Sequence, residues 1–424
     1  MSTIEIRGLT FTYPGAREAT LRNVNVTFGE GDFIALVGNN GCGKSTLCKT
    51  LNGLIPHFIV GDMSGQVLVD GRDTKELEIG TLAAKVGYVY QDFENQIVCP
   101  TVLEDASYAC LNYAMKDYQE KGRKALTVCG LSSKISDYVW QLSGGQKHLL
   151  ALAGMAALSP DILILDEPIA QLDPAHADGI YEVLKKLNEK YNKTIIVIEH
   201  HTEYIARYCR NVVLLKDGTV KWKLPAEEAM RRVDELQESN IFPPQVTIAA
   251  NRMVKEGILP EETVLPVSIQ EGKEIFGPWI KEKDQKRRNS EVKKKDEVMA
   301  SFQNITVRYR SVKGEAPKIL DDFSLDIRKG EKIALIGSNG AGKSTMLKLL
   351  MGLVHPESGT VKVKGKPVRN MSKEELGHTM SLVYQNPEEM FIKDSIRKDI
   401  EYAMKVRKIE NYQERTEELL AMFR

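Results

Sequence analysis

One glycine-rich segment limits the fold of this chain more than any other feature. It lies between an apolar run at 32–37 and a helical pattern at 46–52, and it reads Gly38-Asn39-Asn40-Gly41-Cys42-Gly43-Lys44-Ser45-Thr46. Glycines let several backbone N–H groups turn inward toward phosphate oxygens, and the following helix adds its positive N-terminal end. Lys44 supplies a full charge, and the Ser45 hydroxyl is placed to ligate Mg²⁺. The segment therefore predicts a strand–loop–helix unit that binds a nucleotide phosphate.

The same pattern occurs again in the second half of the chain. After an apolar run at 332–336, which predicts a strand, the sequence reads Gly337-Ser338-Asn339-Gly340-Ala341-Gly342-Lys343-Ser344-Thr345. Further matches surround it: Tyr309 corresponds to Tyr13 and Gln385 to Gln91. Two loops in the same context exclude a chance glycine-rich turn.

Three other apolar runs of the first half end in polar residues that suit phosphate chemistry. The run at 162–165 is followed by Asp166 and Glu167, the run at 194–198 by Glu199 and His200, and the run at 86–90 by Gln91. Apolar runs of this kind predict buried strands of a parallel sheet, whose carboxyl ends hold ligands. Two adjacent carboxylates on one strand are expected to point to opposite faces, so that one serves a metal and the other a water molecule.

These polar residues have distinct expected roles. Asp166 and Gln91 reach Mg²⁺ directly or through water, and Glu167 acts as the general base for the attacking water. His200 hydrogen-bonds the γ-phosphate and orients that water. Tyr13, upstream of the phosphate loop, is a candidate platform on which a purine stacks.

A second anion site is predicted around a pentapeptide that precedes a helical run at 147–158. It reads Leu142-Ser143-Gly144-Gly145-Gln146, and it places a capping hydroxyl and free N–H groups at a helix N-terminus. Asp173 follows in the loop after the 162–167 strand.

Composition excludes several classes of protein. Lys+Arg and Asp+Glu balance at 58 each, so no overall field favours nucleic acid. The six cysteines form no CxxC pair, which indicates reduced thiols and neither a metal cluster nor a disulfide framework. The N-terminus has no export signal, and no apolar stretch approaches the ~20 residues that span a bilayer. A role at a membrane would therefore need another chain.

Taken in order, residues 1 to about 225 resemble the nucleotide-binding domain of ABC transporters. Tyr13, the 38–46 loop, Gln91, the 142–146 pentapeptide and the Asp166-Glu167 pair all match that family's motifs, as do Asp173 and His200. The resemblance implies an α/β P-loop fold with a mainly parallel core sheet, a flanking antiparallel β subdomain and a helical subdomain. It also implies that ATP and Mg²⁺ bind between two such domains, with Ser143, Gly144, Gly145 and Gln146 acting on a partner's γ-phosphate, and that hydrolysis drives a transporter.

A narrower resemblance is to the tandem ATPase of energy-coupling-factor importers for vitamins and metal ions. It rests on the segments 11–14, 91–96, 102–105, 199–203 and 242–246, whereas His148-Leu149 departs from the Gln-Arg of many relatives. The resemblance implies a peripheral protein on the cytoplasmic side of the cell membrane. It also implies that transmembrane subunits dock near Gln91 and that substrate selection resides in those other chains.

The predicted organisation is a complete nucleotide-binding domain at 1–225, a segment with short helices and a charged run at 226–298, and the first part of a second domain at 299–424. From Gln385 onward the second copy follows the first at a constant offset of 294 residues, so Arg424 corresponds to Gly130. The second copy therefore has no counterpart of the 142–146 pentapeptide, Asp166 or His200. We expect a partner nucleotide-binding domain, from a second copy or a separate chain, to complete a working site.

Two other classes stay open at this point. A soluble tandem ABC ATPase that acts on ribosomes or nucleic acid suits the two domains and the charged linker, but Ala170-Gln171 and the neutral charge argue against it. A nucleotide-binding fragment without turnover is the other alternative.

Overall fold

The computed structural model describes residues 4–170, 172–283, 297–308, 318–384 and 387–423. The chain divides into two compact units, residues 1–287 and 288–424, and each is described by itself.

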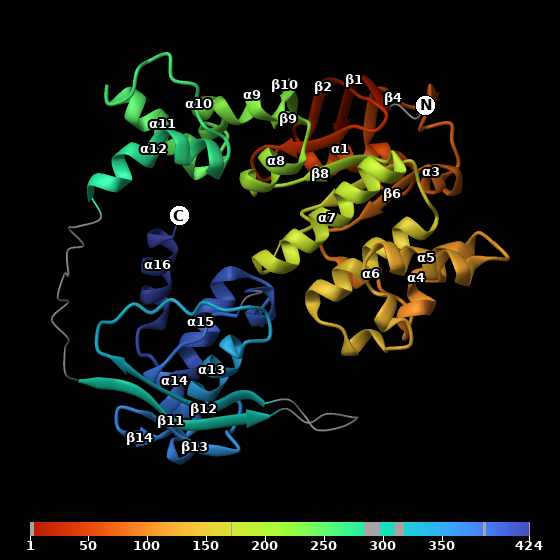
Figure 1. Cartoon of the computed structure of the whole chain (residues 1–424). Helices are drawn as coiled ribbons and strands as arrows, with labels where there is room; N and C mark the ends of the chain where they lie inside the picture. The colour runs from red at the N-terminus through yellow and green to blue at the C-terminus, as the bar shows by residue number, and fades with distance from the viewer. Residues whose placement is uncertain (1–3, 171, 284–296, 309–317, 385–386, 424) are drawn as a thin grey trace. The chain divides into compact units, whose positions relative to one another are not determined.

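Two sheets form the framework of the first unit (Figure 1). A six-stranded sheet has the order β10-β9-β3-β8-β7-β6, in which β6, β7, β8, β3 and β9 run parallel and β10 closes the edge as the antiparallel arm of a hairpin. A four-stranded antiparallel sheet has the order β2-β1-β4-β5. The strands are β1 Ile4–Thr12, β2 Leu21–Phe28, β3 Phe33–Val37, β4 Asp62–Val69, β5 Arg72–Asp73, β6 Val86–Val89, β7 Ile162–Asp166, β8 Thr194–Ile198, β9 Asn211–Lys216 and β10 Thr219–Pro225.

The parallel strands are mainly apolar in their interiors because both faces of the sheet are buried. Phe33, Ala35 and Val37 of β3 belong to a core shared with the helices, whereas Ile34 and Leu36 belong to a core shared with the antiparallel sheet and α1. Figure 1 shows α4, α5 and α6 gathered as a separate group, away from β1, β2 and β4. The predicted α/β fold, with its parallel core, antiparallel β subdomain and helical subdomain, is confirmed.

The helices of the first unit have the following bounds: α1 Lys44–Leu51, α2 Leu54–His57, α3 Ile79–Lys85, α4 Val102–Asn112, α5 Tyr118–Val128, α6 Gly144–Ala157, α7 Pro174–Tyr191, α8 Thr202–Tyr208, α9 Ala226–Arg231, α10 Val233–Gln237, α11 Gln245–Lys255 and α12 Ile269–Lys283. Helices α9 to α12 follow the last strand and belong to the first unit. A hydrogen bond of 2.7 Å from the Thr202 hydroxyl in α8 to the carbonyl of Phe242 ties the segment between α10 and α11 to the rest of this unit. The first part of the 226–298 segment is thus helical and packed, and the domain boundaries at 225 and 298 stay a prediction.

The second unit repeats the antiparallel part of the first. Its sheet has the order β12-β11-β13-β14, and Phe302 of β11 pairs with Leu325 on one side and Val361 on the other, as Ile6 pairs with Val26 and Val67. The elements are β11 Val298–Arg308, β12 Lys318–Arg328, α13 Lys343–Leu350, β13 Ser358–Val363, β14 Lys366–Pro367, α14 Lys373–Thr379, α15 Ile396–Val406 and α16 Tyr412–Met422.

The predicted strand at 332–336 is not formed, and this expectation was wrong. Residues 332–336 have no strand partner among the described residues of the second unit, and Ile336 is 95% exposed. In the first unit the corresponding strand β3 pairs with β8 on one side and β9 on the other. A central parallel strand exists only through such neighbours, because its backbone groups bond to them and its apolar side chains need cover. The apolar run alone therefore does not make a strand.

Candidate functional site

The phosphate loop joins the central strand β3 to α1 in a backbone path that only glycine permits at its start. Gly38 has φ 154°, and a Cβ there would lie 2.1 Å from the carbonyl oxygen of Leu215 on β9. Lys44 is 7% exposed, and its Nζ donates to the carbonyls of Gly38 at 2.7 Å and Asn39 at 2.9 Å. Gly43 caps α1 without a side-chain acceptor, so the first N–H groups of the helix are available to an anion. The loop thus presents one ammonium and several amides to the same point.

Tyr13 lies at the start of α1, next to the phosphate loop. Its hydroxyl is 3.1 Å from Oγ1 of Thr46, and its ring packs edge-on against Phe11 with a centroid distance of 4.9 Å. The structure therefore brings the predicted purine platform to the loop, and the stacking role itself stays a prediction.

Asp166 ends β7 in a buried position and faces the phosphate loop. It is 7% exposed, accepts a hydrogen bond from the Tyr88 hydroxyl at 3.0 Å, and is also hydrogen-bonded to Ser45. Burial raises the pKa of its carboxyl group, and the hydrogen bond from Ser45 opposes this. A hydroxyl and a carboxylate oxygen at one point are hard ligands that suit Mg²⁺. Ser45 and Asp166 therefore fit the predicted metal.

Glu167 lies just past β7 and makes contacts to two other predicted site residues. Gln91 Nε2 donates to Glu167 Oε2 at 2.9 Å, and His200 Nε2 lies 3.3 Å from Glu167 Oε1 without the alignment of a hydrogen bond. The adjacent His200 imidazole lowers the pKa of the Glu167 carboxyl group, so this carboxylate is ionised at neutral pH. An ionised carboxylate that accepts a hydrogen bond from an amide and lies beside an imidazole is equipped to accept a proton from water.

The separation of the two carboxylates has a different origin from the one that the sequence predicted. β7 ends at Asp166, and Glu167 has a left-handed backbone with φ 51°, held by its N–H bond of 3.0 Å to the carbonyl of Ile198. A sharp turn, and not the pleat of a strand, directs Asp166 and Glu167 to different positions. A non-glycine residue with positive φ is uncommon, and for a glutamate, unlike asparagine or aspartate, this conformation is disfavoured.

The 142–146 pentapeptide forms the N-terminus of α6. Ser143 Oγ accepts the N–H of Gln146 at 3.3 Å, and Gln146 Oε1 accepts the N–H of Ser143 at 3.0 Å, which is a capping box. Gly145 lies against α7, because a Cβ there would be 2.4 Å from Cδ2 of His176. Asp173 caps α7 and accepts hydrogen bonds from the N–H of His176 at 3.1 Å and from its ring nitrogen at 2.9 Å. The pentapeptide and the Asp173 loop therefore form one group of predicted site residues, with Gly144 at its exposed end.

A junction between α6 and the segment after Gln91 was not predicted from the sequence. In the short 3₁₀ helix Phe93–Gln96, Phe93 stacks on His148 with a centroid distance of 3.8 Å, and Glu94 forms an ion pair of 2.7 Å with Lys147. His148 is 2% exposed, and neither ring nitrogen has a hydrogen-bond partner in the described part of the chain. The departure at His148-Leu149 was the one signal in the sequence that could have pointed here.

The second phosphate loop has the same internal hydrogen bonds as the first. Lys343 Nζ donates to the carbonyls of Gly337 at 2.7 Å and Ser338 at 2.8 Å, and Gly342 caps α13 with φ 91°. Gly340, Ser344 and Thr345 complete the loop and the start of the helix. Tyr309 and Gln385, predicted as site residues of this copy, lie outside the described residues.

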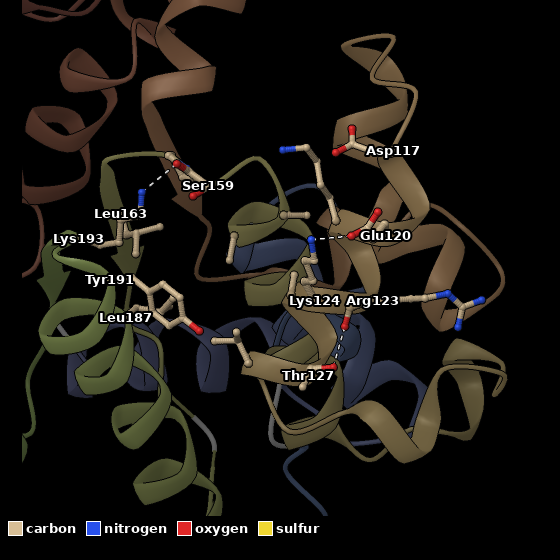
Figure 2. Close-up of a pocket in the computed structure, with 16 residues that line it drawn as sticks. Asp117, Glu120, Arg123, Lys124, Thr127, Ser159, Leu163, Leu187, Tyr191 and Lys193 are labelled. Atoms are coloured by element: carbon tan, nitrogen blue, oxygen red, sulfur yellow. Dashed lines mark hydrogen bonds and ion pairs between the residues drawn. The ribbon is translucent and has the colours of Figure 1, made fainter.

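A cavity of about 560 Å³ lies elsewhere, between α5 and the end of α7 (Figure 2). Figure 2 shows the ion pair between Lys124 and Glu120 on one side of the cavity and Tyr191 with Leu187 on the other side. None of the predicted site residues that the structure describes lines this cavity.

The loop, the carboxylate pair and the glutamine and histidine beside them define a P-loop nucleotide hydrolase. The family model described as ABC transporter matches residues 21–170 and again 320–424. The chain belongs to this family: it is an ABC transporter ATP-binding subunit and an ATPase.

Individual relatives agree with this assignment. A provisionally named ABC transporter ATP-binding protein of Methanosarcina mazei is 32% identical over 97% of this chain and 71% of its own length. A similarly named protein of Caldanaerobacter subterraneus is 31% identical over 95% of this chain and 71% of its own. Among solved structures, CbiO1 from Clostridium perfringens, part of the ABC transporter complex CbiONQ, is 28% identical with a TM-score of 0.51, covering 59% of this chain and 98% of that one.

The described residues contain no helix that is both long enough and apolar enough to cross a membrane.

Proposed function

We propose that this chain is the ATP-hydrolysing subunit of an importer of the energy-coupling-factor type, bound to the cytoplasmic side of the cell membrane, and that it powers uptake of a small solute such as a vitamin or a metal ion. The observation that carries the hydrolytic part is the position of Glu167 between Gln91 and His200, next to the phosphate loop. The subfamily part is supported by the likeness to CbiO1 and by the segments around Gln91 and His200.

The main predicted residues take the following roles in this proposal. Tyr13 stacks the adenine, the loop amides with Lys44 hold the phosphates, and Ser45, Asp166 and Gln91 hold Mg²⁺ directly or through water. That ion, when bound, neutralises charge on the β- and γ-phosphates. Glu167 accepts the proton of the attacking water, and His200 orients that water. Ser143 and Gly145 act on the γ-phosphate of a partner domain, since phosphoryl transfer needs mainly positioning and charge neutralisation.

The partner arrangement in this proposal has two parts. Residues 299–424 are the first part of a second nucleotide-binding domain, and a complete domain from a second copy or a separate chain faces the first phosphate loop. Transmembrane subunits dock beside Gln91, where a cavity of about 300 Å³ is lined by residues that include Tyr90, Val98 and Tyr108. Nearby apolar side chains are exposed, with Val98 at 60% and Leu111 at 50%.

The hydrolytic role is tested with Glu167→Gln in the full chain. Replacing the base is expected to lower kcat by about 10²–10⁴-fold while ATP still binds, because the loop and Lys44 are unchanged. Steady-state phosphate release and equilibrium binding of ATP with Mg²⁺ measure the two effects. Glu189→Gln, on the exposed face of α7, is the matched control and keeps wild-type turnover. Wild-type turnover in Glu167→Gln would overturn the role of Glu167.

The docking role is tested with Val98→Asp and Leu111→Asp. A charge buried against a membrane partner is costly, so both variants are expected to shift the chain from the membrane fraction to the supernatant of lysed source cells. ATP binding stays unchanged. Ile258→Asp alters an apolar side chain that is 43% exposed in another part of the first unit and keeps the wild-type distribution. An unchanged distribution of the first two variants would contradict docking at this surface.

A further inference from the structure

A buried carboxylate lies between the end of β8 and the predicted catalytic histidine in the sequence. Glu199 is 2% exposed, and its Oε1 accepts the backbone N–H groups of His200 at 2.8 Å and His201 at 2.9 Å. Its Oε2 accepts the hydroxyl of Tyr181 at 2.9 Å. Three donors therefore satisfy one carboxylate inside the protein.

The two backbone bonds determine how the chain leaves β8. They close a tight turn between β8 and α8. They also give hydrogen-bond partners to the backbone N–H groups of His200 and His201, which restricts the backbone of this turn. Burial raises the pKa of the Glu199 carboxyl group, and the two amide bonds oppose that effect. With the turn closed, His200 Nε2 lies 3.3 Å from Glu167 Oε1. The turn that Glu199 closes is therefore the turn that carries His200.

Tyr181 connects this turn to another element. It lies in the middle of α7, is fully buried, and stacks on Tyr204 and Tyr208 of α8 with centroid distances of 4.9 Å. Helix α7 has Asp173 as its N-cap, and His176 in its first turn lies against Gly145 of the pentapeptide. The Tyr181–Glu199 bond therefore joins the helix that starts at the Asp173 loop to the turn that carries His200.

We propose that Glu199 is a positioning residue for ATP hydrolysis, and that with Tyr181 it holds the turn that directs His200 toward Glu167. The inference rests on the function proposed above, since it acts through His200. It assigns Glu199 no contact with nucleotide or metal.

The test measures ATP turnover of the full chain in Glu199→Ala, His200→Ala and the double variant. Loss of the turn displaces the imidazole, so Glu199→Ala is expected to lower kcat by about 10–100-fold. KM for ATP stays within about twofold, because the loop and Lys44 are unchanged. If Glu199 acts only through His200, the double variant has the kcat of His200→Ala within about twofold. A double variant slower by the product of the two single effects overturns the inference.

Conservative variants separate positioning from folding. Glu199→Gln keeps an oxygen for both amides and offers an N–H to the Tyr181 oxygen, so its kcat is expected within about threefold of wild type. Tyr181→Phe removes one donor and lowers kcat, whereas Tyr208→Phe, whose hydroxyl bonds the exposed Glu182 at 2.7 Å, keeps the wild-type value. If Glu199→Ala does not fold, Tyr181→Phe replaces it in the cycle with His200→Ala. Equal kcat in Tyr181→Phe and Tyr208→Phe would then contradict the proposal.

The outcomes also separate this inference from the function on which it rests. Wild-type kcat in His200→Ala would remove the proposed role of His200, and the inference with it. A slow His200→Ala beside a fully active Glu199→Ala would overturn the inference alone.

Discussion

At the scale of single residues, the site depends on how this fold treats buried polar groups. Asp166, Glu199 and His148 are all buried, and the two carboxylates accept hydrogen bonds, whereas the described residues offer no partner to either ring nitrogen of His148. A buried polar group without a partner costs stability, and an ionised one costs more. His148 therefore stays neutral, and burial lowers its pKa from 6.5 to about 4.

The lowered pKa of His148 makes stability depend on pH. The unfolded chain binds a proton to this imidazole near pH 6.5, whereas the folded chain does so only near pH 4. Unfolding therefore takes up a proton between these values, and the free energy of unfolding falls as the pH decreases from 6.5 toward 4. From pH 7.5 to pH 5 the loss is about 2 kcal/mol.

We expect His148→Phe, which keeps a ring on Phe93, to lack this part of the pH dependence. Denaturant unfolding of both proteins at the two pH values measures it, because other titrating groups contribute equally to both. An identical pH dependence in the two proteins would show that folding does not lower the pKa of His148.

At the scale of elements, the helix that begins at Ser143 fits α7 closely. A Cβ on Gly145 would meet the ring of His176, which Asp173 holds in place, whereas a Cβ on Gly144 would meet nothing within 4 Å. Gly145→Ala is expected to reduce the free energy of unfolding by about 1–3 kcal/mol, because the added methyl group would clash with the His176 ring and push α6 away from α7. Gly144→Ala is the matched control and is expected to change it by less than about 0.5 kcal/mol. Thermal unfolding compares them, and equal midpoints would mean that His176 moves aside without cost.

Elements that are buried on both faces were the most predictable from the sequence. The apolar runs of β3, β7 and β8 lie where the pattern indicated. The run at 332–336 has the same local character but no strand neighbours in the described part of the chain. Local sequence does not encode which segments will pair. Within the site, loop glycines and strand-end polar residues were predictable from spacing. The Tyr181–Glu199 bond was not, since it joins a helix interior to a strand end and no spacing in the sequence signals it.

At the scale of the whole molecule, the chain carries two phosphate loops in different surroundings. Lys44 and Lys343 make the same pair of carbonyl contacts within their own loops. The first loop follows a fully buried strand, whereas the residues before the second are exposed. Both loops are formed, but the first is held more firmly by its surroundings. A more preorganised loop loses less entropy on binding, so we expect the first site to bind ATP more tightly.

Equilibrium titration of the full chain with ATP and Mg²⁺ should therefore show two sites of unequal affinity. Lys44→Ala is expected to remove the tighter site and Lys343→Ala the weaker one, because each loses the ammonium at the centre of its loop. The double variant should bind no nucleotide at concentrations that saturate the wild type. Lys49→Ala and Lys348→Ala, in the last turns of α1 and α13, are matched controls that keep both sites. A stoichiometry of one that only Lys44→Ala abolishes would mean that the second loop, although it is formed, does not bind nucleotide in this chain.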